Sequence, residues 1–321
     1  MIDIESHLAD ADRDAALRLD VLTGLTATPK WLPPKWFYDD VGSQLYEEIT
    51  TLEEYYPFRA ERAALKAHAD DIAALTGAKT LIELGSGASD KTRLLLDALA
   101  DRGALAGYVG FDVSGAALAQ ASERLQSEYP RLAIGGIVGD FTRHLRYLPP
   151  GGDRLIAFLG GTIGNLLPGA RAAFLADVRL RLNPGEWLLL GADLVKDPSI
   201  LVPAYDDARG VTARFNRNVL RVLNRRLGAD FAGDAFMHVA AWDADNEWIE
   251  MRLRAMRPMR VTIPDPGLTV DFAAGEELRT EVSAKFRRDG ITGELAAAGF
   301  APRGWWTDPR GLFSLTLAQA V

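Results

Sequence analysis

The chain has 321 residues, of which 48% are hydrophobic and 25% charged, so it can bury two cores, or one core with a large insertion, and shows no bias toward disorder. Lysine and arginine total 36 against 44 acidic residues, and the net charge of −8, without a basic run that carries aromatic residues, disfavours nucleic acid as a partner. The absence of cysteine excludes disulfides, thiolate metal sites and a cysteine nucleophile, and it favours a cytoplasmic location.

The first eight residues contain early acidic side chains and no long apolar run. This composition predicts neither a signal peptide nor a membrane span, and we expect a soluble protein. We also expect a monomer that binds neither nucleic acid nor membrane and holds no metal.

Residues 80–92 combine a short apolar strand, a glycine turn and a polar helix start, an order typical of adenosine cofactor sites. Dinucleotides require G-x-G-x-x-G, but Asp90 replaces the third glycine, and an acid at a helix start opposes a pyrophosphate. S-adenosylmethionine has no phosphate, and Gly85 and Gly87 permit the close backbone approach that it needs. Glu83 would add a negative charge near its sulfonium. The turn alone fits any strand-to-helix connection equally well.

The next two predicted strands decide between these interpretations. Residues 108–113 contain Asp112 at the strand end, where both carboxylate oxygens can accept ribose hydroxyls. Residues 134–141 end in Asp140, placed to accept the adenine amino group, and Phe141, placed to cover a ring face. One such aspartate is more often a helix N-cap, but three consecutive strand ends predict S-adenosylmethionine as the cosubstrate. The predicted cofactor-binding residues are Gly85, Ser86, Gly87, Lys91, Asp112, Asp140 and Phe141.

Two further apolar strands, at residues 155–160 and 187–193, flank a helix at residues 170–182. Continuous apolar runs of this kind predict a parallel, doubly wound sheet covered by helices on both faces. The loop at residues 160–166 then lies at the carboxyl edge of the sheet, where ligands bind. Asn165 in this loop can accept a hydrogen bond from an attacking amine, but it can equally well cap the turn.

The pattern changes after residue 193. A helical region is expected over residues 204–227, and alternating segments at residues 248–255 and 268–272 indicate antiparallel strands. Residues 313–317 can rejoin the first sheet. The fold class is therefore α/β, a doubly wound Rossmann-like core with a second, α+β, substrate-binding domain. We assign residues 62–196 and 286–321 to the core and residues 1–61 and 197–285 to the second domain.

Seven blocks of this chain carry further information, and several of them have no general role in such a fold. The seven are Lys35–Ser43, Glu54–Pro57, Glu83–Gly87, Phe158–Asn165, Asp193–Asp197, Phe215–Asn218 and Phe272–Glu277. From about Leu22 to Leu317 the chain resembles the histidine Nα-methyltransferases of ergothioneine biosynthesis. That family transfers three methyl groups from S-adenosylmethionine to the α-amine of free L-histidine, giving hercynine, and the resemblance implies the same enzyme activity here. The visible departures in the cofactor loop are Ala88 and Asp90.

The resemblance also implies which residues bind the substrate. Tyr38 and Asn165, the implied catalytic residues, lie with Tyr205 around the amino and carboxylate ends of histidine. Glu281 and Ser283 match the pair that holds the imidazole, since a carboxylate and a hydroxyl suit two ring nitrogens. The full set is Tyr38, Tyr55, Asn165, Tyr205, Phe215, Met251, Glu281 and Ser283. By itself, Glu281 is more typical of a surface charge and Met251 of a core position.

Three alternatives stay open at this stage. A related enzyme could methylate another free amino acid such as tryptophan, which the pair Glu281 and Ser283 disfavours. A Rossmann oxidoreductase is opposed by the missing third glycine. A non-catalytic scaffold is opposed by the presence of Asn165 and Tyr38. No dedicated base is evident for removing the proton of the amine, so most catalysis is expected from positioning.

Overall fold

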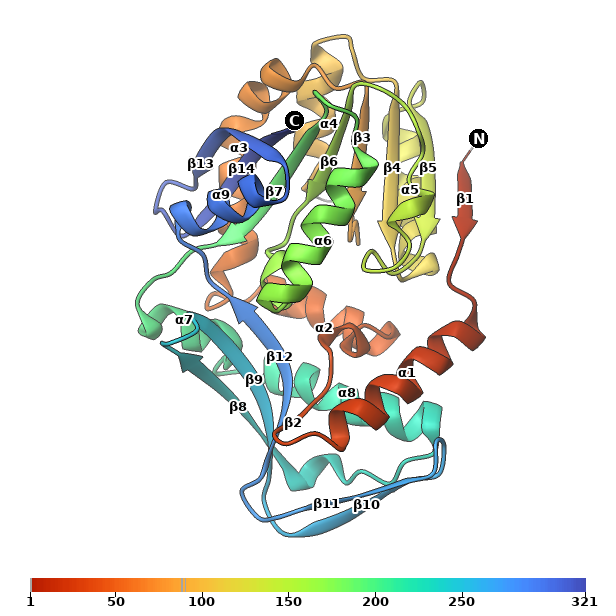
Figure 1. The fold of residues 1–321 in the computed structure, drawn as a ribbon, viewed down its shortest axis with the longest axis vertical. Coiled ribbons are helices and arrows are strands. Elements are labelled where there is room, and N and C mark those ends of the chain that lie inside the picture. Colours follow the sequence, from red (N-terminus) through yellow and green to blue (C-terminus); the bar gives the residue numbers. More distant parts are fainter. Residues whose placement is uncertain (1, 88, 90) are drawn as a thin grey trace. The chain divides into compact units, whose positions relative to one another are not determined.

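A computed structural model describes residues 2–87, 89 and 91–321 (Figure 1). Ala88 and Asp90, which the sequence places in the cofactor loop, lie outside the described residues. The backbone forms two compact units. Unit 1 contains Met1–Leu8, Pro57–Val195 and Phe286–Val321, and unit 2 contains Ala9–Tyr56 and Lys196–Lys285.

The main difference from the predicted boundaries is at the N-terminus, which the sequence analysis assigned to the second domain. A short strand, β1 (Asp3–Ser6), instead pairs in parallel with β5 (Ala133–Val138) of unit 1. Its burial pattern is mostly exposed, so it carries no apolar run that would mark it as part of a sheet. Edge strands of this kind are defined by backbone pairing, which a residue pattern does not reveal.

The described part of unit 1 is built on one eight-stranded sheet. In spatial order its strands are β1, β5, β4 (Gly107–Asp112), β3 (Thr80–Leu84), β6 (Arg154–Phe158), β7 (Trp187–Asp193), β14 (Phe313–Ala320) and β13 (Phe300–Thr307). In this order, neighbouring strands from β1 to β7 pair in parallel, while β14 runs antiparallel to β7 and β13 runs antiparallel to β14. This confirms the doubly wound fold class, and β14 contains the segment predicted to rejoin the first sheet.

Helices cover both faces of this sheet, as its continuous apolar strands require. The helices of the unit are α3 (Tyr56–Thr76), α4 (Thr92–Asp101), α5 (Gly115–Glu128), α6 (Pro168–Arg181) and α9 (Arg288–Ala297). Figure 1 shows α6 in front of the sheet, with α3 and α4 behind it. Leu155 and Ala157 of β6 belong to the core cluster with α3 and α4, whereas the ring centre of Phe158 lies 4.7 Å from that of Phe174 in α6.

Unit 2 is an α+β structure with a four-stranded sheet and a two-stranded hairpin among its described residues. The sheet has the order β2 (Lys30–Trp31), β12 (Glu277–Ala284), β9 (Trp248–Ala255) and β8 (Phe236–Asp243), and the hairpin is β10 (Met259–Ile263) and β11 (Leu268–Phe272). The antiparallel pairing of β12, β9 and β8 agrees with the alternating segments in the sequence. Its helices are α1 (Asp10–Leu25), α2 (Asp40–Thr50), α7 (Pro198–Tyr205) and α8 (Val211–Leu227).

The helical region expected over residues 204–227 is two helices, so this expectation needs correction. Asp207 interrupts it because its carboxylate accepts the backbone N–H groups of Val211 at 2.9 Å and Thr212 at 2.7 Å. These bonds cap the start of α8 and hold residues that would otherwise continue α7. Gly210 adopts the left-handed region with φ of +67°, which no long helix interior uses.

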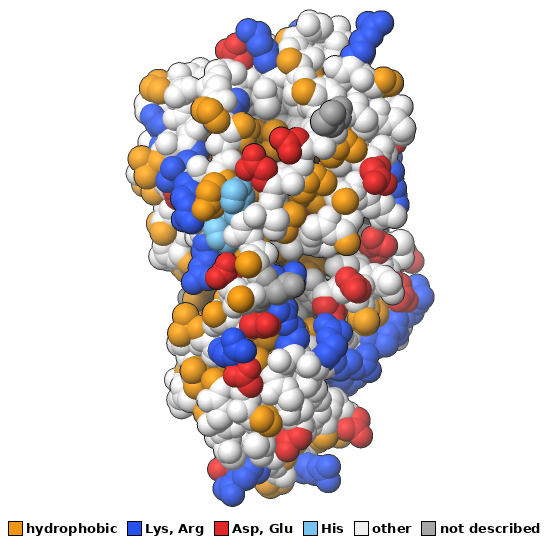
Figure 2. All heavy atoms as spheres, turned by 90° about the vertical axis from the view of Figure 1, so that its right-hand side faces the viewer, with side chains coloured by type: hydrophobic (Ala, Val, Ile, Leu, Met, Phe, Trp, Pro, Cys, Tyr) orange, Lys and Arg blue, Asp and Glu red, His pale blue; other side chains and the backbone are white. Residues whose placement is uncertain are grey.

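The surface of the described residues mixes both signs of charge. Figure 2 shows acidic and basic side chains interspersed over one face of the molecule. Within the described residues, no helix is both long and apolar enough to cross a membrane.

Candidate active-site residues in the two units

The glycine turn of unit 1 follows β3 at the carboxyl edge of the sheet. Gly85 and Gly87 have φ angles of +73° and +49°, a region that side chains other than glycine rarely adopt. A Cβ atom added to either would meet none of the described residues within 4 Å. Backbone conformation, and not close packing against the described residues, therefore explains the glycines.

Asp112, at the end of β4, fixes this turn. One carboxylate oxygen accepts the Gly87 N–H at 2.9 Å and the other accepts the Ser114 N–H at 2.9 Å. Burial is the largest influence on the pKa of Asp112 and raises it, while the hydrogen bonds oppose that rise. Each oxygen keeps a second lone pair, so the carboxylate can hold the turn and still accept the two predicted ribose hydroxyls.

Glu83 lies just before the turn, and the sequence predicts that it adds a negative charge near the sulfonium. Its side chain is buried, and the hydroxyls of Thr92 and Tyr108 both donate to one of its oxygens. Burial raises its pKa from 4.5 to about 7 against these hydrogen bonds. A nearby cation would favour the ionised form, so the charge beside the sulfonium stays a prediction.

Asp140 and Phe141 follow β5. The Asp140 carboxylate accepts hydrogen bonds from the backbone N–H and the hydroxyl of Thr142. The backbone N–H of Asp140 donates to Nδ1 of His144 at 3.0 Å. The Phe141 ring packs 5.1 Å from Phe158 in an edge-on arrangement. These contacts fix the loop in which both residues lie, and their contacts with adenine stay predictions.

Lys91, also predicted to bind the cofactor, has protein partners in unit 1. Its ammonium forms an ion pair with Glu61 of α3 and lies 5.0 Å from the centre of the Phe58 ring. Ser86 at the turn is buried and accepts the N–H of Ser89 through its backbone carbonyl. The ion pair of Lys91 therefore links the cofactor loop to α3, and the backbone bond between Ser86 and Ser89 holds part of the loop together.

Asn165 ends a short 3₁₀ helix, η3 (Thr162–Asn165), in the loop after β6. Strands β3 and β6 are neighbours in register, so this loop and the glycine turn leave the same edge of the sheet. The loop opens with Gly160 and Gly161 in the left-handed region, at φ of +79° and +69°. This geometry places Asn165 at the carboxyl edge of the sheet, as the sequence predicts. We call this edge, with the glycine turn and the Asn165 loop, the cofactor edge.

Four of the substrate residues implied by the resemblance come together in unit 2. Tyr38 lies 5.5 Å from Phe215, and Tyr55 lies 6.3 Å from Tyr205, both measured between ring centres. Tyr46, which sequence reasoning missed, joins the two pairs because its ring lies 5.6 Å from Tyr38 and 6.3 Å from Tyr55. Burial, with the neighbouring tyrosines, raises the pKa of Tyr55 well above its usual range.

A buried hydroxyl pair adjoins this aromatic cluster. The hydroxyls of Tyr205 and Ser283 lie 2.8 Å apart, and the Lys285 ammonium donates to each of them at 2.8 Å. Lys285 is only 3% exposed. Sequence reasoning missed it, although Lys285 directly follows the end of β12, and a two-residue period continued past Ser283 would place it on the same side. A lysine in this position makes both hydroxyl oxygens acceptors. One of the two hydroxyls donates to the other, which leaves one hydroxyl proton for a ligand.

A β-bulge in β12 decides which face carries Glu281 and Ser283. Arg279 pairs with Arg252, but Glu281 then pairs with Met251, so the register shifts by one residue between them. Without the shift, the two-residue period would place Glu281 on the face of Glu277. The bulge therefore moves Glu281 and Ser283 to the face of Met251 and brings these three predicted residues together.

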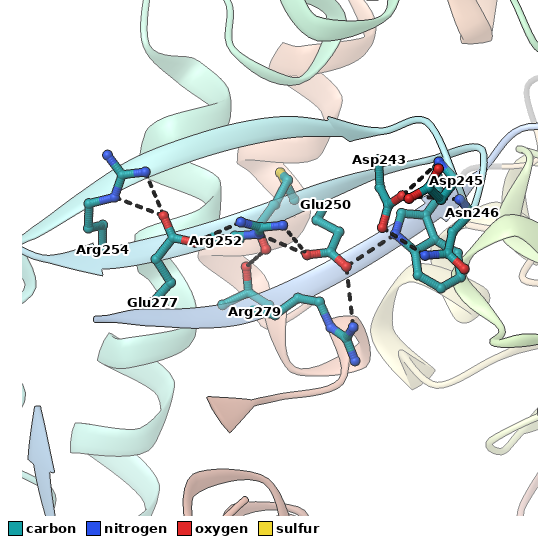
Figure 3. Close-up of polar contacts among 11 residues, drawn as sticks. Asp243, Asp245, Asn246, Glu250, Arg252, Arg254, Glu277 and Arg279 are labelled. Carbon is teal, nitrogen blue, oxygen red and sulfur yellow. Dashed lines mark hydrogen bonds and ion pairs between the residues drawn. The ribbon is translucent and has the colours of Figure 1, made fainter. Parts of the chain in front are cut away.

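The opposite face of the same sheet carries a ladder of ion pairs (Figure 3). Glu277 accepts from Arg252 at 2.7 Å and from Arg254 at 2.8 Å, and Glu250 accepts from Arg252 at 2.8 Å and from Arg279 at 3.3 Å. The polar groups drawn in this view bind one another. The predicted substrate residues of the sheet thus lie on the face away from this ladder.

His238 of β8 was also missed. Its Nε2 lies 2.8 Å from the carbonyl oxygen of Tyr205, and its Nδ1 lies 2.8 Å from the side-chain nitrogen of Asn216. Both bonds form only if Nε2 carries the proton and Nδ1 accepts, which is the neutral ring. Burial lowers the pKa of His238 and favours that form. The ring therefore anchors the backbone that carries Tyr205.

Comparisons with known proteins add to this geometry. Residues 17–320 match the sequence model of a family described as "Histidine-specific methyltransferase, SAM-dependent". The chain is 54% identical over 317 residues to the histidine N-alpha-methyltransferase of Mycolicibacterium smegmatis, covering 99% of each. It is 32% identical over 226 residues to ergothioneine biosynthesis protein 1 of Schizosaccharomyces pombe, covering 67% of this chain and 29% of that protein. The L-tryptophan methyltransferase of Psilocybe serbica is 27% identical over 354 residues, covering 100% of this chain and 97% of that protein.

Proposed function

Because the chain belongs to the histidine-specific, S-adenosylmethionine-dependent methyltransferase family, we propose that it trimethylates the α-amine of free L-histidine to hercynine, the first step of ergothioneine biosynthesis. Family membership confirms the predicted enzyme class and S-adenosylmethionine as the cosubstrate. The observation that carries the substrate is the full-length match, at 54% identity, to a protein named for this activity.

The arrangement of β12 supports histidine as the substrate. The bulge places the Glu281 carboxylate and the Ser283 hydroxyl on one face, two residues apart. An imidazole has one nitrogen that donates and one that accepts in its neutral form, and this pair offers an acceptor and a donor. Tyr205, which is hydrogen-bonded to Ser283, is the residue that the resemblance places near the amino and carboxylate ends of the substrate.

The reaction is a displacement at the methyl carbon. The neutral amine forms a C–N bond as the C–S bond breaks, and sulfur leaves with the electron pair as neutral S-adenosylhomocysteine. Each of the first two transfers leaves an ammonium that must lose a proton before the next, and the third leaves a permanent positive charge. We assign Asn165 and Tyr38 the role of accepting hydrogen bonds from the amine and orienting its lone pair. Well-oriented reactants can lower a barrier by roughly 7–11 kcal/mol, so positioning is the main contribution.

One incubation tests the proposal. The purified protein is supplied with S-adenosylmethionine and an equal mixture of the twenty amino acids, and mass spectrometry identifies which amino acid gains mass and how many methyl groups it gains. Trimethylated histidine is the expected product. Methylated tryptophan would overturn the substrate assignment and favour the activity for which the Psilocybe relative is named. The cytoplasmic location and the monomeric state stay predictions.

A further inference from the structure

Glu61 is a fully buried carboxylate that no step above uses. It lies on α3 in unit 1 and its side chain has no solvent exposure. Both of its oxygens accept the backbone N–H of Gly160, at 2.7 and 2.9 Å, and one of them also pairs with the Lys91 ammonium. A buried charge is costly unless it is paired and hydrogen-bonded, and Glu61 meets both conditions through these two partners.

The packing around Glu61 preserves this position. Gly191 of β7 lies beside it, and a Cβ atom added there would be 2.1 Å from a Glu61 oxygen. The fully buried strand β7 thus has a glycine where the carboxylate needs space. Glu61 also influences Glu83 electrostatically and raises its pKa, whereas Lys91 lowers it. The carboxylate therefore lies close to the glycine turn and its buried network.

The two partners of Glu61 belong to two different loops at the cofactor edge. Gly160 opens the loop that ends in Asn165. Its left-handed backbone conformation differs from that of a strand, so the chain turns away from the direction of β6 at this residue. Lys91 is the last residue of the glycine-rich loop, immediately before α4. A single carboxylate thus joins the loop predicted to hold the cosubstrate to the loop predicted to hold the amine.

We propose that Glu61 is a positioning residue that sets the glycine-rich loop and the Asn165 loop in one arrangement for binding the cosubstrate and transferring its methyl group. It acts through the Gly160 N–H and the Lys91 ammonium and has no assigned contact with either substrate. The cosubstrate part depends only on family membership. The Asn165 part rests on the proposed function.

Two substitutions in the full chain test the proposal. Glu61→Gln keeps an acceptor for Gly160 but removes the charge that faces Lys91. Glu61→Asp keeps the charge but shortens the side chain, so that it cannot reach both partners together. We expect each variant to bind S-adenosylhomocysteine about tenfold more weakly in calorimetry, since hydrogen bonds to charged groups are the stronger ones. We also expect kcat to fall about tenfold when both substrates are saturating, because the Asn165 loop loses its anchor.

Glu186 provides a matched control. It is also a buried carboxylate of unit 1, it pairs with Arg154, and it accepts the backbone N–H groups of Arg154 and Asn183. It precedes β7, at the end of the sheet opposite the cofactor loops. Glu186→Gln should lower the thermal midpoint while S-adenosylhomocysteine affinity and kcat stay within twofold of the parent protein.

The outcomes separate positioning from simple stabilisation. Wild-type affinity in the folded Glu61→Asp variant, an unchanged kcat, or an equal loss of affinity in Glu186→Gln would overturn the proposal. Because S-adenosylhomocysteine binds without histidine, the affinity result holds even if the mixture experiment identifies another amino acid as the substrate. Should Glu61→Gln fail to fold, Glu61→Asp, which retains a negative charge at this position, still decides the question.

Discussion

The cofactor edge of unit 1 and the aromatic cluster of unit 2 are assembled in different ways. At the cofactor edge, successive strand ends deliver their residues in chain order, and Asp112 bonds to the Gly87 N–H of the neighbouring turn. In unit 2, the cluster joins side chains far apart in sequence, such as Tyr38 with Phe215 and Tyr205 with Ser283. The cofactor edge thus follows from contacts between neighbouring strands, whereas the aromatic cluster, the predicted substrate site, depends on tertiary packing.

The largest expected effect tests the local side of this comparison. Asp112→Ala removes two acceptors for predicted ribose hydroxyls and releases the Gly87 N–H at the same time. We expect S-adenosylhomocysteine affinity to fall about a thousandfold in calorimetry, because several hydrogen bonds to a charged group are lost together.

Asp207→Ala is the control for this substitution. Asp207 in unit 2 also accepts two backbone N–H groups, so its removal reproduces the structural cost of losing a capping carboxylate. Affinity within threefold of the parent protein is expected. A comparable loss in both variants would mean that Asp112 acts only by supporting the fold.

Much of the cofactor edge can be predicted from sequence because its signals are short-range. The glycine turn, the aspartates at strand ends and the return of residues 313–317 to the sheet all follow from local patterns. The pairing of β1, the interruption at Asp207 and the bulge before Glu281 do not, because each depends on backbone hydrogen bonds that many sequences can form or omit. In unit 2 the resemblance to a family implies a site role for Glu281 and Met251, which periodicity alone would assign to a surface and a core.

The buried lysine and carboxylates were missed for a related reason. Lys285 and Glu61 are charged, and charged residues are mostly exposed unless they find partners. Their partners are 80 and 99 residues away in sequence, at Tyr205 and Gly160 respectively. A single sequence contains no signal for such a pairing, although Lys285 directly follows the end of β12 and a continued two-residue period would place it on the Ser283 side.

The next largest effect is a dependence of stability on pH, which we expect at the cofactor edge because the buried carboxyl of Glu83 titrates there. The pKa of Glu83 is about 7 in the folded protein against 4.5 ordinarily, so the folded chain binds the proton more tightly than the unfolded chain. Its contribution to stability is fully present below pH 4.5 and is lost as the pH rises through 7, a change of roughly 3 kcal/mol. Glu83→Gln should remove this decline in urea midpoints measured between pH 5 and 8.

Glu186→Gln is again an informative control. The Arg154 guanidinium and backbone N–H groups outweigh burial and lower the pKa of Glu186, so its contribution is lost only as the pH falls below the ordinary carboxylate range. Its substitution should leave the decline from pH 5 to 8 in place. An unchanged decline in Glu83→Gln would assign it to another group.

A third substitution tests the residues of unit 2 that tertiary packing brings together. Glu281→Ala should weaken histidine binding about thirtyfold in calorimetry and leave S-adenosylhomocysteine affinity unchanged, because a charge-assisted contact to the imidazole is lost. Glu277→Ala is the matched control on the same strand, since the bulge puts Glu277 on the ion-pair face. Equal histidine affinity in the two variants would remove Glu281 from the site and with it the functional meaning of the bulge.

The smallest effect concerns Lys285, which we expect to act on the substrate through the hydroxyls of Tyr205 and Ser283. Lys285→Met keeps most of the buried volume but removes the donor that makes Tyr205 and Ser283 acceptors. We expect KM for histidine to rise about fivefold with kcat within twofold, since one neutral hydroxyl contact becomes misdirected. Combined with Ser283→Ala, the loss should be less than additive, because both substitutions disable the same donor.

Lys196→Met is the control, as Lys196 likewise donates to a tyrosine hydroxyl, that of Tyr56, at 2.8 Å. Additive losses, or an equal rise in KM for Lys196→Met, would mean that Lys285 supports unit 2 in general and does not position the pair of hydroxyls.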